Sequence, residues 1–192
     1  MQLVTHTPTR SYDLGYLRIY VLRADGRSAP APPWVSDPDA GDVLYAAIHG
    51  HGSVAASQER QETCVHVGDI VFCDPRQPES VRCGRSCVMT VLRVPRRSLG
   101  IAPSDLRRIQ GVRLACAEGA RARVTCFLTA LVSEAECRRT RIGDRLARSA
   151  VELLAVLVTE WALERRQGHR AELRPGADGV RTEERTVPDA VA

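Results

Sequence analysis

Apolar residues in the first half of the chain come in short runs separated by turn residues, a pattern typical of β-strands. The runs are rich in β-branched and aromatic side chains, and Gly, Asp or Pro bounds most of them. Some seven short strands with a turn about every ten residues predict an antiparallel barrel or sandwich. The predicted strands are 14–22, 43–49, 52–57, 62–67, 70–73, 80–82 and 87–94.

The stretch Val65–Pro78, VHVGDIVFCDPRQP, is the most informative of these. Gly68 and Asp69 supply a tight turn, the run Ile70–Cys73 reads as a buried strand, and the prolines that follow cannot continue a ladder. The segment 26–40 holds four prolines around Trp34 and is predicted to be a loop.

In the second half of the chain the apolar residues change to helical spacing. Short helical turns are predicted at Arg96–Leu99 and after Ser104, a residue type that caps helix N-termini. Residues 124–137 place apolar side chains on one side of a helix. A longer helix is predicted from Ile142 to Gln167, closed by Gly168.

The long helix carries more apolar residues than one core requires. A second apolar stripe lies beside the first, which favours a helix covered on both sides and therefore a homodimer. The alternative is a helix buried within one subunit by the helix at 124–137. The residues predicted to dimerise are Leu146, Val151, Leu153, Leu154, Leu157, Val158 and Trp161.

Composition narrows the class of protein. A chain of 192 residues that is 44% hydrophobic can bury one core, and its first residues lack the pattern of a secretory signal. No apolar run approaches the length of a membrane span, so a soluble cytoplasmic protein is expected. The net charge is +4, and all 27 basic residues are Arg. This usage indicates codon bias, and the Arg clusters read as solvated helix faces.

Neither metal nor catalytic chemistry is indicated by the residue pattern. Seven cysteines without a signal peptide argue against a disulfide framework. His49 and His51 form half of a cupin metal set, but the next acid, Glu59, falls in a predicted turn, and Glu79 stands where a ligating His is expected. We therefore expect no metal, no cofactor and no catalytic residue.

A ligand pocket, if present, should be lined by alternate strand positions. Tyr45 and His49 share one face of their strand, while Leu44, Ala46 and Ile48 share the other and are apolar enough for core. The predicted ligand-binding residues are Tyr45, His49 and His66, with Trp34 as a lid from the proline-rich loop. The alternatives are a hydrogen-bonded wall histidine and a tryptophan that covers the barrel end.

The order of these elements resembles the amino-terminal cupin-like domain of AraC/XylS-type transcription regulators. The resemblance covers about residues 14–167 and rests on VGDIVFCDPRQP, with Val67 in place of the usual Pro, and on CVMTVLRVPRRSLG before the two helices. It implies an α+β fold, a cupin-like β jelly-roll barrel followed by two C-terminal helices. It also implies a small effector and dimerisation through the helices.

The chain is predicted to have four parts. They are an N-terminal arm (1–13), the cupin-like barrel (14–95), a helical dimerisation region (96–168) and a polar tail (169–192) expected to be disordered. Regulators of this type carry two further helix-turn-helix motifs, which this sequence does not show.

The expected partners are therefore a second copy or a full-length regulator, with a possible effector, no membrane, and no sequence-specific DNA binding by this chain alone. A natural stand-alone partner, a frameshifted gene and a deliberately shortened chain all fit the sequence. A small cupin enzyme or a stand-alone cupin binding protein is the alternative.

Overall fold

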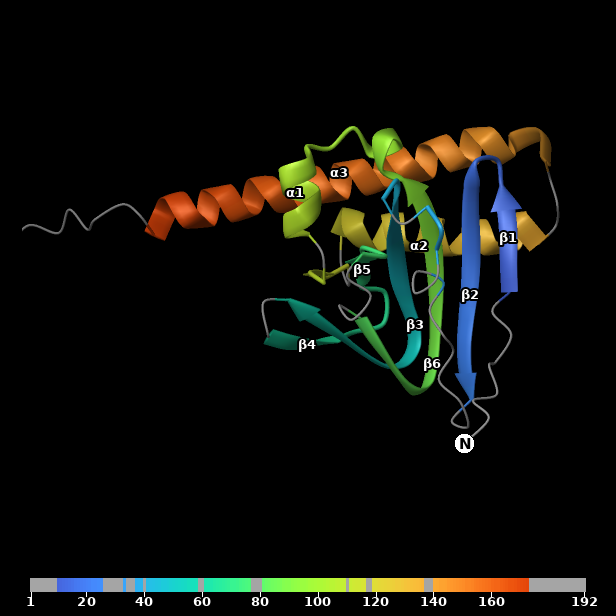
Figure 1. The fold of residues 1–192 in the computed structure, drawn as a ribbon, viewed down its shortest axis with the longest axis horizontal. Helices are drawn as coiled ribbons and strands as arrows, with labels where there is room; N and C mark the ends of the chain where they lie inside the picture. The colour runs from blue at the N-terminus through green and yellow to red at the C-terminus, as the bar shows by residue number, and fades with distance from the viewer. Residues whose placement is uncertain are drawn as a thin grey trace, which may run out of the picture.

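The computed structural model describes residues 10–25, 33, 37–39, 41–58, 61–76, 81–109, 111–116, 119–136 and 140–172. Within these residues it contains strands, three α-helices and a 3-10 helix at Arg96–Leu99 (Figure 1). The strands are β1 (Arg10–Leu14), β2 (Leu17–Asp25), β3 (Val43–Gln58), β4 (Gln61–Val65), β5 (Ile70–Cys73), β6 (Val81–Pro95) and β7 (Arg113–Leu114). The helices are α1 (Pro103–Arg108), α2 (Gly119–Glu136) and α3 (Thr140–Glu172).

All described strands join one antiparallel sheet. Its order is β1-β2-β6-β3-β5-β7, and β4 pairs with the far end of β3. The long strands β3 and β6 pair along most of their length and form the centre of the sheet. The expected sheet-rich α+β fold with two long helices after the sheet is confirmed, while closure into a jelly roll stays a prediction.

Two pairs of predicted strands are single strands in the structure, because bulges let a strand continue through an irregular residue. The predicted strands 80–82 and 87–94 both belong to β6. The runs 43–49 and 52–57 belong to one strand, β3, whose register shifts between His49 and His51 and again after Gly52. Gly52 has a φ of +90°, and a Cβ there would lie 2.7 Å from the Cα of Cys87. Only glycine fits where β3 passes this close to the β6 backbone, and β3 bends at this residue.

The first predicted strand, 14–22, is instead a hairpin. Leu14 ends β1 and Leu17 begins β2, with Gly15 and Tyr16 as the two-residue turn between them. Strand β1 therefore occupies residues 10–14, most of them within the segment expected to be an arm. Gly15 has a φ of +58°, which is the backbone conformation such a turn requires.

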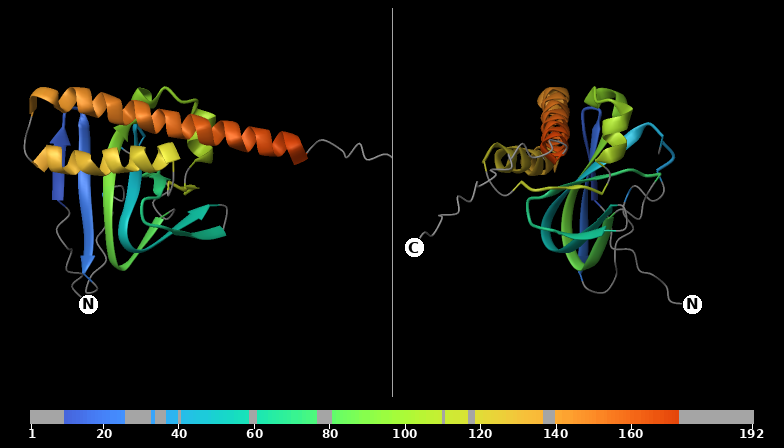
Figure 2. Two further views of the ribbon diagram at one scale, coloured as in Figure 1. Left: turned by 180° about the vertical axis from the view of Figure 1, so that it is seen from behind. Right: turned by 90° about the vertical axis from the view of Figure 1, so that its left-hand side faces the viewer.

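The helices α2 and α3 lie side by side on one face of the sheet (Figure 2). Helix α3 continues past Gly168 to Glu172, although the glycine was predicted to end it. An interior glycine costs a helix only about 1 kcal/mol, so it does not by itself stop one. The C-terminal part of α3 projects beyond the sheet (Figure 1).

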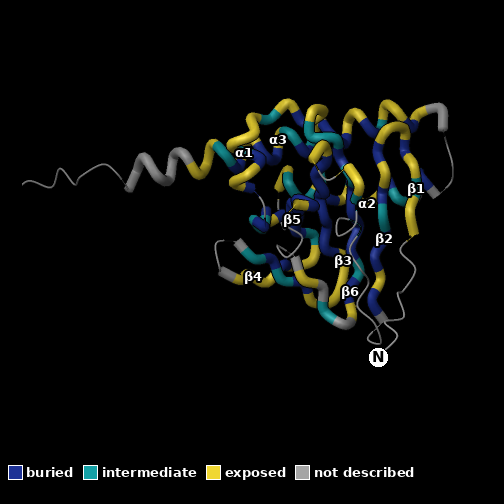
Figure 3. Tube along the Cα trace, in the orientation of Figure 1, coloured by how far each residue is buried: buried dark blue, intermediate teal, exposed yellow. Residues whose placement is uncertain are grey.

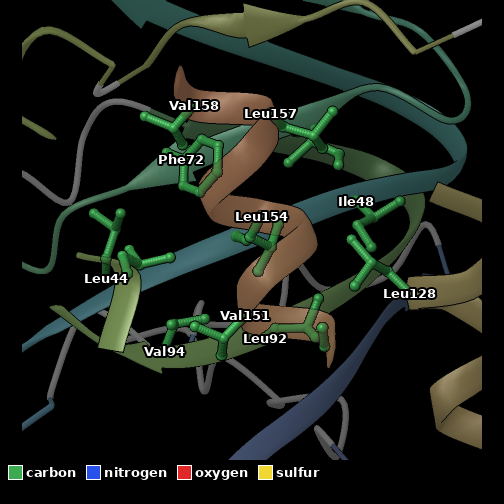
Figure 4. Close-up of a cluster of buried hydrophobic side chains, with 14 of the residues drawn as sticks. Leu44, Ile48, Phe72, Leu92, Val94, Leu128, Val151, Leu154, Leu157 and Val158 are labelled. Carbon is green, nitrogen blue, oxygen red and sulfur yellow. The ribbon is translucent and has the colours of Figure 1, made fainter. Parts of the chain in front are cut away.

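Strand alternation gives the sheet two apolar faces and hence two cores. One core lies under the helices, where Leu154 and Val158 of α3 meet Leu44, Phe72 and Leu92 of the sheet (Figure 4). The other lies on the opposite face and includes Tyr45, Ala47, Val71, Met89 and Val91. Leu44, Ala46 and Ile48 are buried, as expected from the sequence.

Most of the α3 residues predicted to dimerise belong to the core of their own subunit. Because α3 lies flat on the sheet with α2 alongside, it buries a face wider than one stripe. The alternative of a helix covered within one subunit therefore describes these positions better. Val151, Leu154, Leu157, Val158 and Trp161 are at most 9% exposed, and Leu146 and Leu153 are partly buried.

Candidate functional site

A hollow of about 570 Å³ opens beside the β1–β2 turn, on the sheet face away from the helices. Three of the four tyrosines in the chain line it, although aromatic residues make up only 4% of the sequence. Two arginines and three aspartates also line it, so the hollow combines aromatic walls with charge. The lining residues are Asp13, Gly15, Tyr16, Leu17, Arg18, Tyr20, Pro33, Asp37, Pro38, Asp39, Tyr45 and Arg93.

One wall of the hollow is a hydrogen-bonded network centred on Asp37. Arg93 of β6 lies directly opposite Tyr45 of β3 in the sheet register. Arg93 donates to the Asp37 carboxylate from Nε at 2.8 Å and from Nη2 at 3.2 Å. The Tyr45 hydroxyl donates to the same carboxylate, and Arg93 Nη2 also reaches Asp39 at 2.5 Å.

The local sequence explains why these groups meet. Strand alternation places Tyr45 on the same face as Ala47, and Arg93 on the same face as Val91. The backbone N–H of Asp39 donates to Asp37 Oδ1 at 2.8 Å, a side-chain turn typical of aspartate. That turn holds both carboxylates toward Arg93.

Electrostatics fixes the protonation of the network. The hydrogen bonds from Arg93 lower the pKa of Asp37 to about 2, although burial acts in the opposite direction. Burial and the Asp37 carboxylate raise the pKa of Tyr45 above its ordinary value. At neutral pH the network therefore holds a carboxylate, a guanidinium and a neutral phenol.

The remaining walls are aromatic, and the rim is charged. The rings of Tyr20 and Tyr45 lie 6.2 Å apart between centroids and are tilted by 51°. At the rim, Arg18 forms an exposed ion pair with Asp13 at 2.9 Å. Aromatic faces next to fixed hydrogen-bonding groups can hold a small molecule with a planar part and polar substituents.

His49 lies on the same sheet face as Tyr45 but does not line the hollow. It is 2% exposed and lies opposite Met89 of β6. Neither ring nitrogen has a hydrogen-bond partner within the described part of the chain. A buried polar group without a partner costs about 1–3 kcal/mol, which makes this imidazole a candidate to bind a ligand group.

His66 does not line the hollow, although it begins the turn whose Gly68 N–H donates to the His49 carbonyl at 2.7 Å. Its side chain is 72% exposed, and its Nδ1 is 2.9 Å from Arg113 Nη1. The neighbouring Asp69 accepts hydrogen bonds from the backbone N–H groups of His66 and Cys116, so the Gly-Asp turn holds separate segments together. Trp34 lies outside the described residues. Ligand binding by the four predicted residues thus stays a prediction, and of the three that the structure describes, Tyr45 alone lines the hollow.

The sequence reasoning missed Arg93, Asp37 and Tyr20. Arg93 had a usable signal, because it shares strand parity with the buried Met89 and Val91. A charged residue at an inward position of an apolar strand points to a buried partner. Asp37 carries no such signal, since it lies 56 residues from Arg93 in a segment without periodicity.

Two further observations concern the described residues only. Their His, Cys, Asp and Glu side chains form no group of three or more that could hold a metal ion. None of their helices has the length and apolarity needed to cross a bilayer.

Comparison with known proteins identifies the family to which the chain belongs. Residues 6–159 match the family model of the AraC-binding-like domain. Among solved structures, the chain is similar to the AraC-like transcriptional activator CuxR, with a TM-score of 0.56 and 13% sequence identity. The similarity covers 79% of this chain and 55% of the CuxR chain, so this chain spans about half the length of that structure. No curated protein matches the chain.

Proposed function

Because the chain belongs to the AraC-binding-like domain family, we propose that it is the effector-sensing and dimerisation domain of an AraC-type transcription regulator. The family match confirms the resemblance found in the Gly-Asp turn, the strand that ends at Pro95 and the two helices that follow. The family consists of regulatory ligand-binding domains, so the proposed role is to bind a ligand rather than to convert it, in the cytoplasm.

The hollow beside the β1–β2 turn is the observation that supports effector sensing. Its network presents a carboxylate, a guanidinium and a phenol whose positions are fixed before a ligand arrives. Such preorganisation lowers the entropic cost of binding. The effector we propose is a small molecule with a planar part, which stacks on Tyr20 and hydrogen-bonds to Arg93 or Tyr45.

A binding experiment on two variants tests this site. Fragments should be screened by ligand-observed NMR, and hits should be ranked by the rise in melting temperature that they give the wild type. Tyr45→Phe and Arg93→Gln should each reduce the affinity of the hits about tenfold or more, the loss expected when one charged or polar contact disappears.

Arg82→Gln is the matched control, because Arg82 lies at the opposite end of β6 from Arg93, and its exposed ion pair with Glu62 does not line the hollow. Hits whose affinity is unchanged in Tyr45→Phe and Arg93→Gln would place the effector elsewhere. Stoichiometric iron, zinc or manganese after purification would contradict the purely regulatory role.

The proposed output of the domain is association, either with a second copy or with a full-length regulator. Sedimentation velocity at 1–100 μM should show a reversible dimer of the wild-type chain, roughly the range in which modest interfaces assemble. A monomer over this whole range would contradict homodimerisation and leave the heterodimer, which co-purification with a full-length regulator would test.

A further inference from the structure

The hollow beside the β1–β2 turn has a charge opposite to that of the chain as a whole. The sequence carries a net charge of +4. Among the described residues that line the hollow, the acids are Asp13, Asp37 and Asp39, and the bases are Arg18 and Arg93. Three carboxylates against two guanidiniums leave one negative charge in excess. A ligand that enters the hollow therefore meets acidic walls on a basic protein.

Both arginines of the lining are already paired with carboxylates. Arg93 contacts Asp37 from Nε at 2.8 Å and Asp39 from Nη2 at 2.5 Å. Arg18 contacts Asp13 from Nε at 2.9 Å. An anionic ligand would have to compete with these carboxylates for each guanidinium. The excess negative charge lies beside Arg93, which is shared by two carboxylates.

Asp39 is the carboxylate of this pair that a ligand can reach. Its side chain is 63% exposed, whereas that of Asp37 is 4% exposed. Within the described part of the chain, the hydrogen bond to the Asp39 carboxylate ends on Oδ2. Because each carboxylate oxygen can accept hydrogen bonds, Oδ1 of Asp39 is available to a donor on a ligand.

Tyrosine rings provide a second kind of contact for positive charge. Tyr16, Tyr20 and Tyr45 line the hollow, and the rings of Tyr20 and Tyr45 lie 6.2 Å apart between centroids. Strand β1 and the turn that carries Tyr16 are mostly exposed, so the described residues leave this edge accessible (Figure 3). The face of a tyrosine ring attracts a cation that lies within about 6 Å of the ring centroid.

The nearest charges of α3 do not reverse the excess. Burial raises the pKa of the Tyr16 hydroxyl, and the charges of Arg148, Glu152 and Asp144 also act on it. These α3 side chains are two acids and one base, so the helix side of the rim adds no net positive charge.

We propose that the hollow binds an organic cation, whose charged group lies between the Asp39 carboxylate and the ring of Tyr20. The other polar groups of the ligand then meet Arg93 or Tyr45 at the wall. This inference rests on the proposed effector-sensing function and adds the charge of the effector. Amidines, guanidines and aromatic amines combine a planar part with a positive charge and belong to the proposed class.

The first test compares three fragments that share one aromatic ring and differ in charge. Benzamidine is a cation at pH 7, benzamide is neutral and benzoate is an anion. Dissociation constants from ligand-observed NMR titrations of the wild type should be about tenfold lower for benzamidine than for benzamide, and highest for benzoate. Added salt should weaken the binding of benzamidine and leave that of benzamide unchanged, because salt screens charge.

The second test removes the two contacts of the charged group. Asp39→Asn keeps the shape of the side chain and should weaken benzamidine binding about tenfold without changing benzamide binding. Glu62→Gln is the matched control, because Glu62 is an exposed carboxylate paired with Arg82 outside the hollow.

Two changes at Tyr20 test the aromatic contact. Tyr20→Leu should weaken benzamidine binding severalfold, whereas Tyr20→Phe, which keeps the ring, should retain most of it. All variants should keep the circular dichroism spectrum of the wild type. If Tyr20→Leu does not fold, the ratio of benzamidine to benzamide affinity in Tyr20→Phe and Asp39→Asn still decides the question.

The outcomes separate the charge of the effector from the existence of the site. If benzoate or benzamide binds best and Arg93→Gln weakens it, the hollow is the effector site and the cation is wrong. If benzamidine binds but Asp39→Asn has no effect, the cation binds elsewhere and the inference fails. If none of the three fragments binds, the inference also fails, while the wider fragment screen on Tyr45→Phe and Arg93→Gln still tests effector sensing.

Discussion

Asp37 holds the wall of the hollow together, because two donors from different strands converge on its buried carboxylate. Its side chain is 4% exposed, and Arg93 and Tyr45 both donate to it. The alternation of side chains along a strand predicted Tyr45. The same reasoning applies to Arg93, which was missed, since each is a polar residue at an inward strand position. It could not find Asp37, whose place is set only by the contact itself.

Acidification should destabilise the protein partly through Asp37. Its pKa is about 2 in the folded protein, below the ordinary value of 3.8, so its contribution is fully present above about pH 4 and lost as the pH falls toward 2. Asp37→Asn should be less stable than the wild type at pH 7 but lose less stability between pH 4 and pH 2.

Urea unfolding at several pH values measures this difference. Asp74 retains part of the acid sensitivity in both proteins, because hydrogen bonds from Arg76 and Arg96 outweigh its burial and lower its pKa. Equal losses in the wild type and in Asp37→Asn would show that Arg93 does not stabilise the Asp37 carboxylate.

Among the elements, α3 shows both the strength and the limit of sequence patterns. Its helical period and its start near residue 140 were predictable from the apolar spacing. The sequence could not predict which apolar stripe of α3 faces inward, because that depends on how much of the helix surface α2 and the sheet each cover. Strand existence was likewise predictable, whereas the bulges in β3 and the turn at Gly15 depend on close contacts between distant segments.

Gly15→Ala should be markedly destabilising, because Gly15 combines a φ of +58° with a close contact to α3. A Cβ at Gly15 would lie 2.9 Å from the Cα of Asp144, so the added methyl would push against helix backbone. The backbone conformation alone costs about 1–2 kcal/mol in a residue with a Cβ, and overpacking adds about 1–3 kcal/mol.

Gly100→Ala is the matched control. Gly100 has a φ of +61°, and a Cβ there would meet nothing within 4 Å. It should lose only the conformational part, in urea unfolding followed by circular dichroism. Equal losses in the two variants would mean that the turn and α3 are not in firm contact.

The molecule as a whole has its helices on one face of the sheet (Figure 2). A second core and the hollow lie on the other face. The candidate site and the helices therefore lie on different sides of the sheet, and the β1–β2 turn contacts both. The order of elements was enough to identify the family from sequence. The location of the site needed the structure, because strands, loop and turn contribute to it from separate parts of the chain.

Thermal stability should depend on protein concentration if the whole molecule works as a dimer. Association of folded chains stabilises them by mass action, so the melting temperature of the wild type should rise by several degrees between 1 and 100 μM, roughly as expected for a domain of this size. Differential scanning fluorimetry measures this dependence, and a melting temperature that stays constant over the range would argue against a dimer.

The contact between two glycines has a mechanical consequence. Gly15, in the wall of the hollow, and Gly143, in the first turn of α3, meet with no side chain between them, since even a Cβ on Gly143 would lie 3.3 Å from the Gly15 nitrogen. Helix α3 is 33 residues long, which corresponds to about 50 Å at the rise of an α-helix. If α3 tilted by about 5° about the Gly15–Gly143 contact, its far end would move by about 4 Å. A change at the turn that tilted α3 would therefore displace the far end of the helix much more than the end that contacts Gly15.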